Sequence, residues 1–137
     1  MTNLTLAQSY LFKATKRLKI LPVLLEEDYS DVVRETQEIV ELAQKAMLRQ
    51  VGIDPPKWHD VGKILLENAE LFLEEISTTL PELARISKRL RKERELAFHG
   101  DVDFIPTEEY TREDALQTME EASLVVEVAR KLIKPEF

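Results

Sequence analysis

The chain has no cysteine and no long apolar run. Without cysteine it cannot form disulfides, thiolate zinc sites or a cysteine nucleophile. No uninterrupted apolar stretch is long enough to cross a bilayer, and the first basic residues follow the first apolar ones, the reverse of a secretory signal. We therefore expect a cytoplasmic protein that has no membrane partner.

Glycine and proline are also scarce, with three and six in 137 residues, and most of them cluster at a few boundaries. The segments between these boundaries must be long, because Gly and Pro are the residues that most often interrupt helices. A chain of this length builds one core rather than two. It is therefore predicted to be a single helical domain spanning residues 1–137.

Apolar residues recur at steps of three and four through most of the chain, which is the spacing of one buried helix face. Mostly short connections favour antiparallel neighbours. The predicted fold class is all-α: an up-and-down antiparallel helical bundle of four long helices with one shorter or irregular helix. The expected helical segments are residues 4–25, 29–51, 60–76, 81–99 and 111–133.

Polar residues and glycines stand where these helices should begin and end. Side-chain oxygens cap the first free N–H groups of a helix, and glycine commonly follows its last turn. Pro22 is expected to kink or loosen the end of the first segment. The expected start signals are Asp28 or Ser30, Asp60, and a capping box of Thr111 with Asp114, and the stop signals are Gly52 and Gly100.

The net charge of −7 disfavours binding of nucleic acid by the whole surface, so any contact with RNA must be local. One local candidate exists in "ARISKRLRKER", which contains six basic residues and one acid. A phosphate-binding strip that includes Lys88, Arg91 and Arg94 is one interpretation. The other, commoner one is a solvated helix face whose charges are balanced by acids elsewhere.

Arg94 occupies a position where its helix should bury an apolar side chain. Leu83, Ile86 and Leu90 mark the inner stripe of this helix, and three-four spacing continues it to Arg94 and Ala97. Burying an unpaired guanidinium costs several kcal/mol, so Arg94 should have an anionic partner, line a cleft or face another subunit. His99 follows five residues later at the helix end, where the helix dipole favours a protonated imidazole.

Other candidate sites are weaker. In "WHD", residues 58–60, a metal-binding His-Asp pair would need further histidines, and capping by Asp60 explains the motif better. Glu41 lies opposite the apolar face of its helix and should be on the surface. There is no glycine-rich phosphate loop, nucleophile elbow or ladder of metal ligands. No metal and no cofactor are therefore expected.

Arg94 and His99 form an R-x4-H arrangement at the end of a late helix. Together with "AQSYLFKATKRL", "QEIVELAQKAMLRQVGIDPPKWHDVGKILLE" and "YTREDALQTMEEASLVVEVARKL", it makes the chain resemble a small stand-alone prokaryotic HEPN domain over nearly its whole length. The resemblance implies a homodimeric helical bundle in which Arg and His of both subunits gather near the two-fold axis. Active members of this family are metal-independent endoribonucleases, and many pair with a minimal nucleotidyltransferase as toxin and antitoxin.

The resemblance leaves two functions open. In the first, Arg94 and His99 are catalytic: His99 acts as general acid or base at the ribose, and Arg94 stabilises charge on the scissile phosphate. In the second, the same cleft binds a nucleotide or docks the nucleotidyltransferase without catalysis. Active members usually have Asn, Asp or His directly after the arginine, where this chain has Glu95. Members that their nucleotidyltransferase partner modifies often have a tyrosine two positions after the histidine, where this chain has Asp101.

Overall fold

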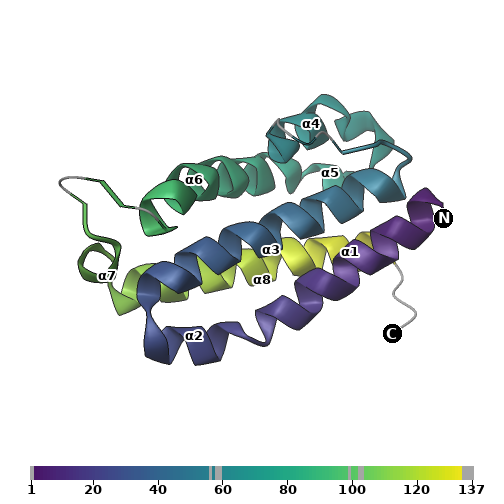
Figure 1. Ribbon diagram of the computed structural model, residues 1–137. Helices are drawn as coiled ribbons and strands as arrows, with labels where there is room; N and C mark the ends of the chain where they lie inside the picture. The colour runs from purple at the N-terminus through teal and green to yellow at the C-terminus, as the bar shows by residue number, and fades with distance from the viewer. Residues whose placement is uncertain (1, 56, 58–59, 99, 102–103, 134–137) are drawn as a thin grey trace.

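A computed structural model describes residues 2–55, 57, 60–98, 100–101 and 104–133, and for residues 3 and 94–98 it describes the backbone alone. Four long helices dominate it: α1 (Asn3–Leu18), α3 (Tyr29–Gln50), α6 (Leu80–Phe98) and α8 (Arg112–Leu132). They run alternately up and down, with α3 at the centre in contact with α1, α6 and α8 (Figure 1). The predicted all-α, up-and-down bundle is confirmed.

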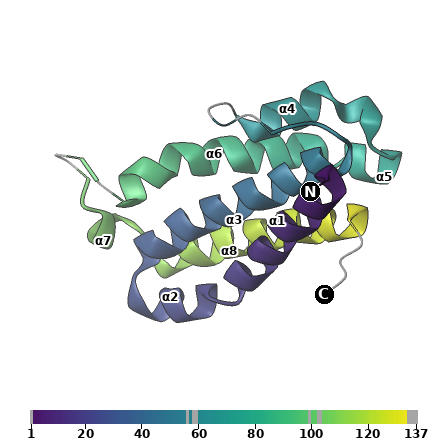
Figure 2. The ribbon, with the colours of Figure 1, turned by 45° about the vertical axis from the view of Figure 1, so that its right-hand side comes forward.

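Short helices connect the long ones. They are α2 (Leu21–Glu27), α4 (Val61–Glu67), the 3₁₀ turn η1 (Ala69–Leu71), α5 (Glu74–Ser77) and α7 (Pro106–Glu109). Among them α4 packs beside α6 and runs antiparallel to it (Figure 2). No helix in the described ranges is both long enough and apolar enough to span a bilayer.

The first predicted helix is divided in two. The backbone N–H groups of Lys19 and Ile20 each bond to a carbonyl three residues earlier, which tightens the chain into a turn after Leu18. Pro22 then lies in the first turn of α2, where its missing N–H costs nothing. Pro22 therefore belongs to the start of a new helix rather than to a kink in the old one.

The third predicted helix, residues 60–76, is interrupted instead of continuous. Asn68 ends α4, and its side-chain amide donates a 2.9 Å hydrogen bond to the carbonyl of Ile64. Phe72 then adopts an extended backbone conformation and buries its ring. Leu73 is extended as well, and because successive extended residues point in opposite directions, its side chain is left exposed.

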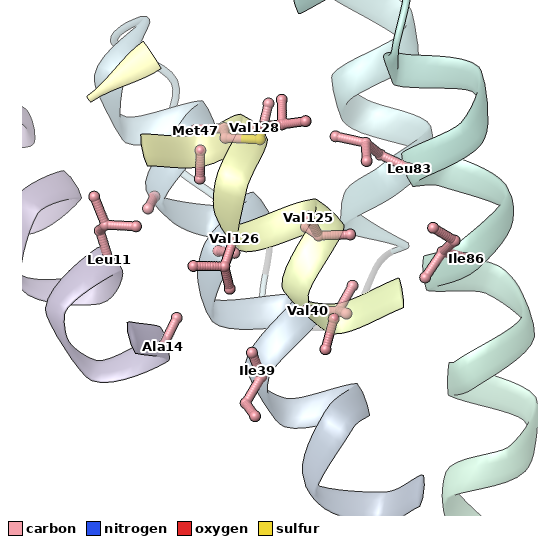
Figure 3. Packing of buried hydrophobic residues seen from close by; sticks show 14 of the residues in the cluster. Leu11, Ala14, Ile39, Val40, Met47, Leu83, Ile86, Val125, Val126 and Val128 are labelled. Carbon is pink, nitrogen blue, oxygen red and sulfur yellow. The ribbon is translucent and has the colours of Figure 1, made fainter. Parts of the chain in front are cut away.

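The buried residues form one hydrophobic core between the long helices. Figure 3 shows α3 at its centre, with Ile39, Val40 and Met47 between Leu11 and Ala14 of α1, Leu83 and Ile86 of α6, and the valines of α8. The apolar positions predicted for the inner faces are mostly buried. Leu4 is an exception, because 54% of it is exposed beyond the end of this core.

The predicted caps are present. Asp28 accepts a hydrogen bond from the Ser30 N–H, and Asp60 accepts one from the Gly62 N–H at 3.0 Å. Thr111 and Asp114 form a reciprocal capping box at the start of α8. Gly52 and Gly100 have φ angles of 85° and 75°, a region that favours glycine, and they stand two residues after the last residues of α3 and α6.

Several polar side chains are buried among the described residues, and Gln44 is one that links two helices. Gln44 of α3 is fully buried, and its amide nitrogen donates a 3.0 Å hydrogen bond to the backbone carbonyl of Leu83 in α6. Since a buried amide without a partner is costly, this bond stabilises the α3–α6 contact.

Candidate functional site

The two residues predicted to be catalytic lie at the C-terminal end of α6. Arg94 is a helical residue four positions before the last residue of α6, Phe98. Its side chain and the whole of His99 lie outside the described residues, as does the side chain of Ala97. Whether Arg94 and His99 meet therefore stays a prediction.

The inner face of α6 is apolar up to Leu90 and then becomes polar. Leu83, Ile86 and Leu90 are buried, as predicted. One turn beyond Leu90, Glu93 is partly buried and accepts a 2.6 Å hydrogen bond from the hydroxyl of Tyr110. Leu90 is thus the last buried residue of α6 among the side chains that the structure describes.

Some residues of the basic strip of α6 form ion pairs and others do not. Arg85 forms an ion pair with Glu82 on the same helix, and Arg89 forms one with Glu121 of α8. Lys88, Arg91 and Lys92 have no carboxylate within ion-pair distance among the described residues. Carboxylates thus balance Arg85 and Arg89, and phosphate binding by Lys88 and Arg91 stays a prediction.

The side chains of Lys88, Arg91 and Lys92 face α4 across an open groove of about 630 Å³. We call it the α4–α6 groove. It is lined by Asp60, Lys63, Ile64 and Glu67 of α4 and its cap, and by Lys88, Arg91 and Lys92 of α6. Four of these residues are cationic and two are anionic, so the groove is locally positive on a chain whose net charge is −7. A local positive field of this kind attracts phosphate groups.

Two contacts hold α4 close to α6. A Cβ on Gly62 would lie 2.8 Å from the Ala84 Cα and 3.2 Å from the Ser87 Cβ, so only glycine allows this approach. Asp60 caps α4 and also accepts a hydrogen bond of 3.4 Å from the Ser87 hydroxyl. The role predicted for Asp60 is confirmed, whereas Trp58 and His59 lie outside the described residues.

The segment after α6 returns to the helix and packs against it. Asp101 and Phe104 exchange two backbone hydrogen bonds, and the rings of Phe104 and Tyr110 meet edge to face at 5.5 Å. The hydroxyl of Tyr110 then reaches Glu93. Burial, the hydrogen bond to Glu93 and the nearby negative charges raise the pKa of Tyr110 well above its ordinary value, so it remains a protonated donor.

Among the residues that the structure describes, no three His, Cys, Asp or Glu side chains are grouped to hold a metal ion. Glu41 is partly exposed and lies 3.9 Å from Lys45, one helical turn away. It therefore has the surface position that the helical spacing predicted.

Comparison with known proteins identifies the family. The HEPN domain family matches residues 7–132, which is most of the chain. The chain belongs to the HEPN domain family. It is also 27% identical to a Methanocaldococcus jannaschii protein named "Putative toxin MJ1304", over 98% of this chain and 93% of that protein. No solved structure matches this HEPN domain.

Sequence reasoning identified the α6 side of the α4–α6 groove of this HEPN domain and missed the α4 side. The basic strip that it singled out contains Lys88, Arg91 and Lys92, but nothing in it pointed to Lys63 of α4. Lys63 has no local signal, because an exposed lysine on a short helix is common and only the packing of α4 on α6 places it opposite Lys88. The hydrogen bond between Glu93 and Tyr110, 17 residues apart, was missed for the same reason.

Proposed function

We propose that this HEPN domain is a metal-independent endoribonuclease in which Arg94 and His99 are the catalytic residues. The observation that carries the proposal is the R-x4-H pair at the end of α6, directly downstream of the cationic residues Lys88 and Arg91. RNA phosphates bound by these two side chains would lie next to the helix end that contains the pair. Family membership supports the same activity.

The two side chains have complementary chemistry for cleavage of an RNA phosphodiester. As the 2′-hydroxyl attacks phosphorus, its proton goes to a neutral imidazole, and the departing 5′-oxygen takes a proton from an imidazolium. His99 is the candidate for these proton transfers. Arg94 carries a permanent charge and stabilises the negative charge that grows on the phosphate oxygens.

A homodimer would supply two copies of Arg94 and His99 near one two-fold axis, so that one histidine accepts a proton while the other donates one. The dimer would also explain an arginine on the inner stripe of α6, since a guanidinium at that position could face the second subunit instead of the core. The relative named as a toxin supports a role as the toxin of a toxin–antitoxin pair. A minimal nucleotidyltransferase is then the proposed partner.

Cleavage of a fluorescently labelled RNA in excess chelator tests the activity. We expect the wild-type dimer to cleave it and His99→Ala to lose about 10²–10⁴-fold in rate, the usual contribution of a general acid or base. Arg94→Ala should fall by a comparable factor, and Arg94→Lys should recover part of it. Lys131→Ala, an exposed change on α8, is the matched control. A His99→Ala protein that cleaves as fast as wild type would overturn the proposal.

A second function is favoured by two acidic residues beside the pair. Glu95 directly follows Arg94, and the exposed Asp101 comes two residues after His99. Negative charge beside a scissile phosphate opposes catalysis, yet the cationic groove can still hold a phosphate. In this case the protein is a non-catalytic module that binds a nucleotide or its nucleotidyltransferase partner. Calorimetric titration with nucleotides, together with no cleavage by wild type, would favour this function.

A further inference from the structure

The α4–α6 groove has cations on both walls. Lys63 projects from α4, and Lys88, Arg91 and Lys92 project from α6. None of the four forms an ion pair with a described carboxylate, and the three lysines are exposed. Elsewhere on α6 the arginines at 85 and 89 are paired, so the unpaired positive charge is concentrated at this groove.

We infer that the α4–α6 groove binds the backbone of a single RNA strand beside the cleavage site, with Lys63 and Lys92 as phosphate contacts. This inference rests on the proposed function, since it names how the RNA is held. A helix rises 1.5 Å per residue, so along α6 Lys88 is about 9 Å from Arg94 and Lys92 is about 3 Å from it. The groove therefore leads along α6 to the position of the catalytic pair.

The lining of the groove suits phosphates and not bases. None of the described lining residues is aromatic, and Ile64 is the apolar one among them. Stacking on aromatic rings is the usual way in which a protein holds the bases of a single strand. Contacts to phosphate position a nucleic acid without reading its sequence. The groove should therefore add affinity without adding sequence preference.

The two carboxylates of the groove have different effects. Asp60 is already engaged by the Gly62 N–H and the Ser87 hydroxyl. Glu67 is exposed at the other end of α4, and no described cation lies within ion-pair distance of it. Because α4 and α6 are antiparallel (Figure 2), Glu67 at the C-terminal end of α4 lies towards the N-terminal part of α6. Its charge repels phosphate at that end, so the strand should leave the groove towards Arg94.

The salt dependence of RNA binding tests this inference. In chelator, the anisotropy of a labelled single-stranded RNA of mixed sequence is titrated with the His99→Ala dimer at several KCl concentrations. The same protein with Lys63→Ala and Lys92→Ala should bind several-fold more weakly at low salt. Its slope of log K against log salt should fall by about 0.7 for each lost contact, about 1.4 in total. A second RNA of different sequence should show the same losses.

A matched control separates the groove from the charge of the whole protein. Lys13→Ala with Lys131→Ala removes two exposed lysines from α1 and α8 and should leave the slope unchanged. Equal losses in both double variants, or an unchanged slope in the groove variant, would overturn the inference. So would a mononucleotide that competes as strongly as the RNA strand. Wild-type protein that binds as expected but does not cleave would refute the proposed activity alone.

Discussion

The hydroxyl of Tyr110 donates a 2.6 Å hydrogen bond to the carboxylate of Glu93 and so joins the segment after α6 to the helix itself. The contact closes a stretch of 17 residues that includes the predicted catalytic histidine. It is supported by the edge-to-face packing of Phe104 on Tyr110. The carboxylate acceptor makes this hydrogen bond stronger than a neutral one.

Tyr110→Phe should lower the free energy of unfolding by about 1–2 kcal/mol, because it removes the donor to the partly buried Glu93 carboxylate. Urea denaturation followed by circular dichroism measures the change. Tyr10→Phe is the control, since no hydrogen bond of the Tyr10 hydroxyl is present among the described residues. Equal effects of the two substitutions would show that the hydrogen bond contributes no stability.

The raised pKa of Tyr110 predicts a loss of stability at alkaline pH. In the unfolded chain the phenol ionises near its ordinary pKa of 10.0, whereas in the folded protein it stays protonated to higher pH. The unfolded state therefore releases a proton first, and stability falls as the pH rises from about 10 through the folded value. Urea midpoints across this range should decline more steeply for wild type than for Tyr110→Phe. Parallel declines would contradict the assignment.

Gly62→Ala should destabilise the protein by about 1–2 kcal/mol. The new methyl would lie 2.8 Å from the Ala84 Cα, which belongs to the backbone of α6 and cannot move aside alone. Overpacking of this kind costs about 1–3 kcal/mol, and the better helix propensity of alanine offsets less than about 1 kcal/mol. Chemical denaturation checks the prediction. A stabilised variant would mean that α4 is not held closely against α6.

Leu90 is buried and Leu73 is exposed, so substitutions of the two residues test where the core ends. Leu90→Ala should cost about 2–5 kcal/mol, because Leu90 is fully buried on the inner face of α6. Leu73→Ala removes the same atoms from a residue that is 72% exposed and should change stability by less than about 0.5 kcal/mol. Thermal and urea unfolding of both variants measure the contrast. Similar losses would mean that Leu73 is buried by another part of the protein or by a second subunit.

Features that depend on neighbours in the chain could be predicted from the sequence. The caps at Asp28, Asp60 and Thr111 involve residues two or three positions apart, and they are all present. The apolar spacing of α3 and α8 identified their buried faces, since each helix repeats its pattern over five or more turns. Helical periodicity is a strong signal at that length.

Features that depend on distant residues could not be predicted. The spacing of residues 60–76 suits a helix, yet Phe72 is extended and its ring is buried in the core that the other helices form. In the same way, Lys63 becomes part of a cationic groove only through the packing of α4 on α6. A one-dimensional pattern contains neither contact.

The buried hydrogen bond from Gln44 to Leu83 has a consequence for which arrangements of the bundle are possible. Apolar faces alone would allow α6 to shift along α3 by part of a turn, because leucine and valine side chains adapt to small displacements. A shift of about half a turn would move the Gln44 amide nitrogen away from the Leu83 carbonyl and leave it between two successive carbonyls of α6, at a cost of about 1–3 kcal/mol. This polar residue thereby restricts the axial position of the helix that carries the predicted catalytic pair.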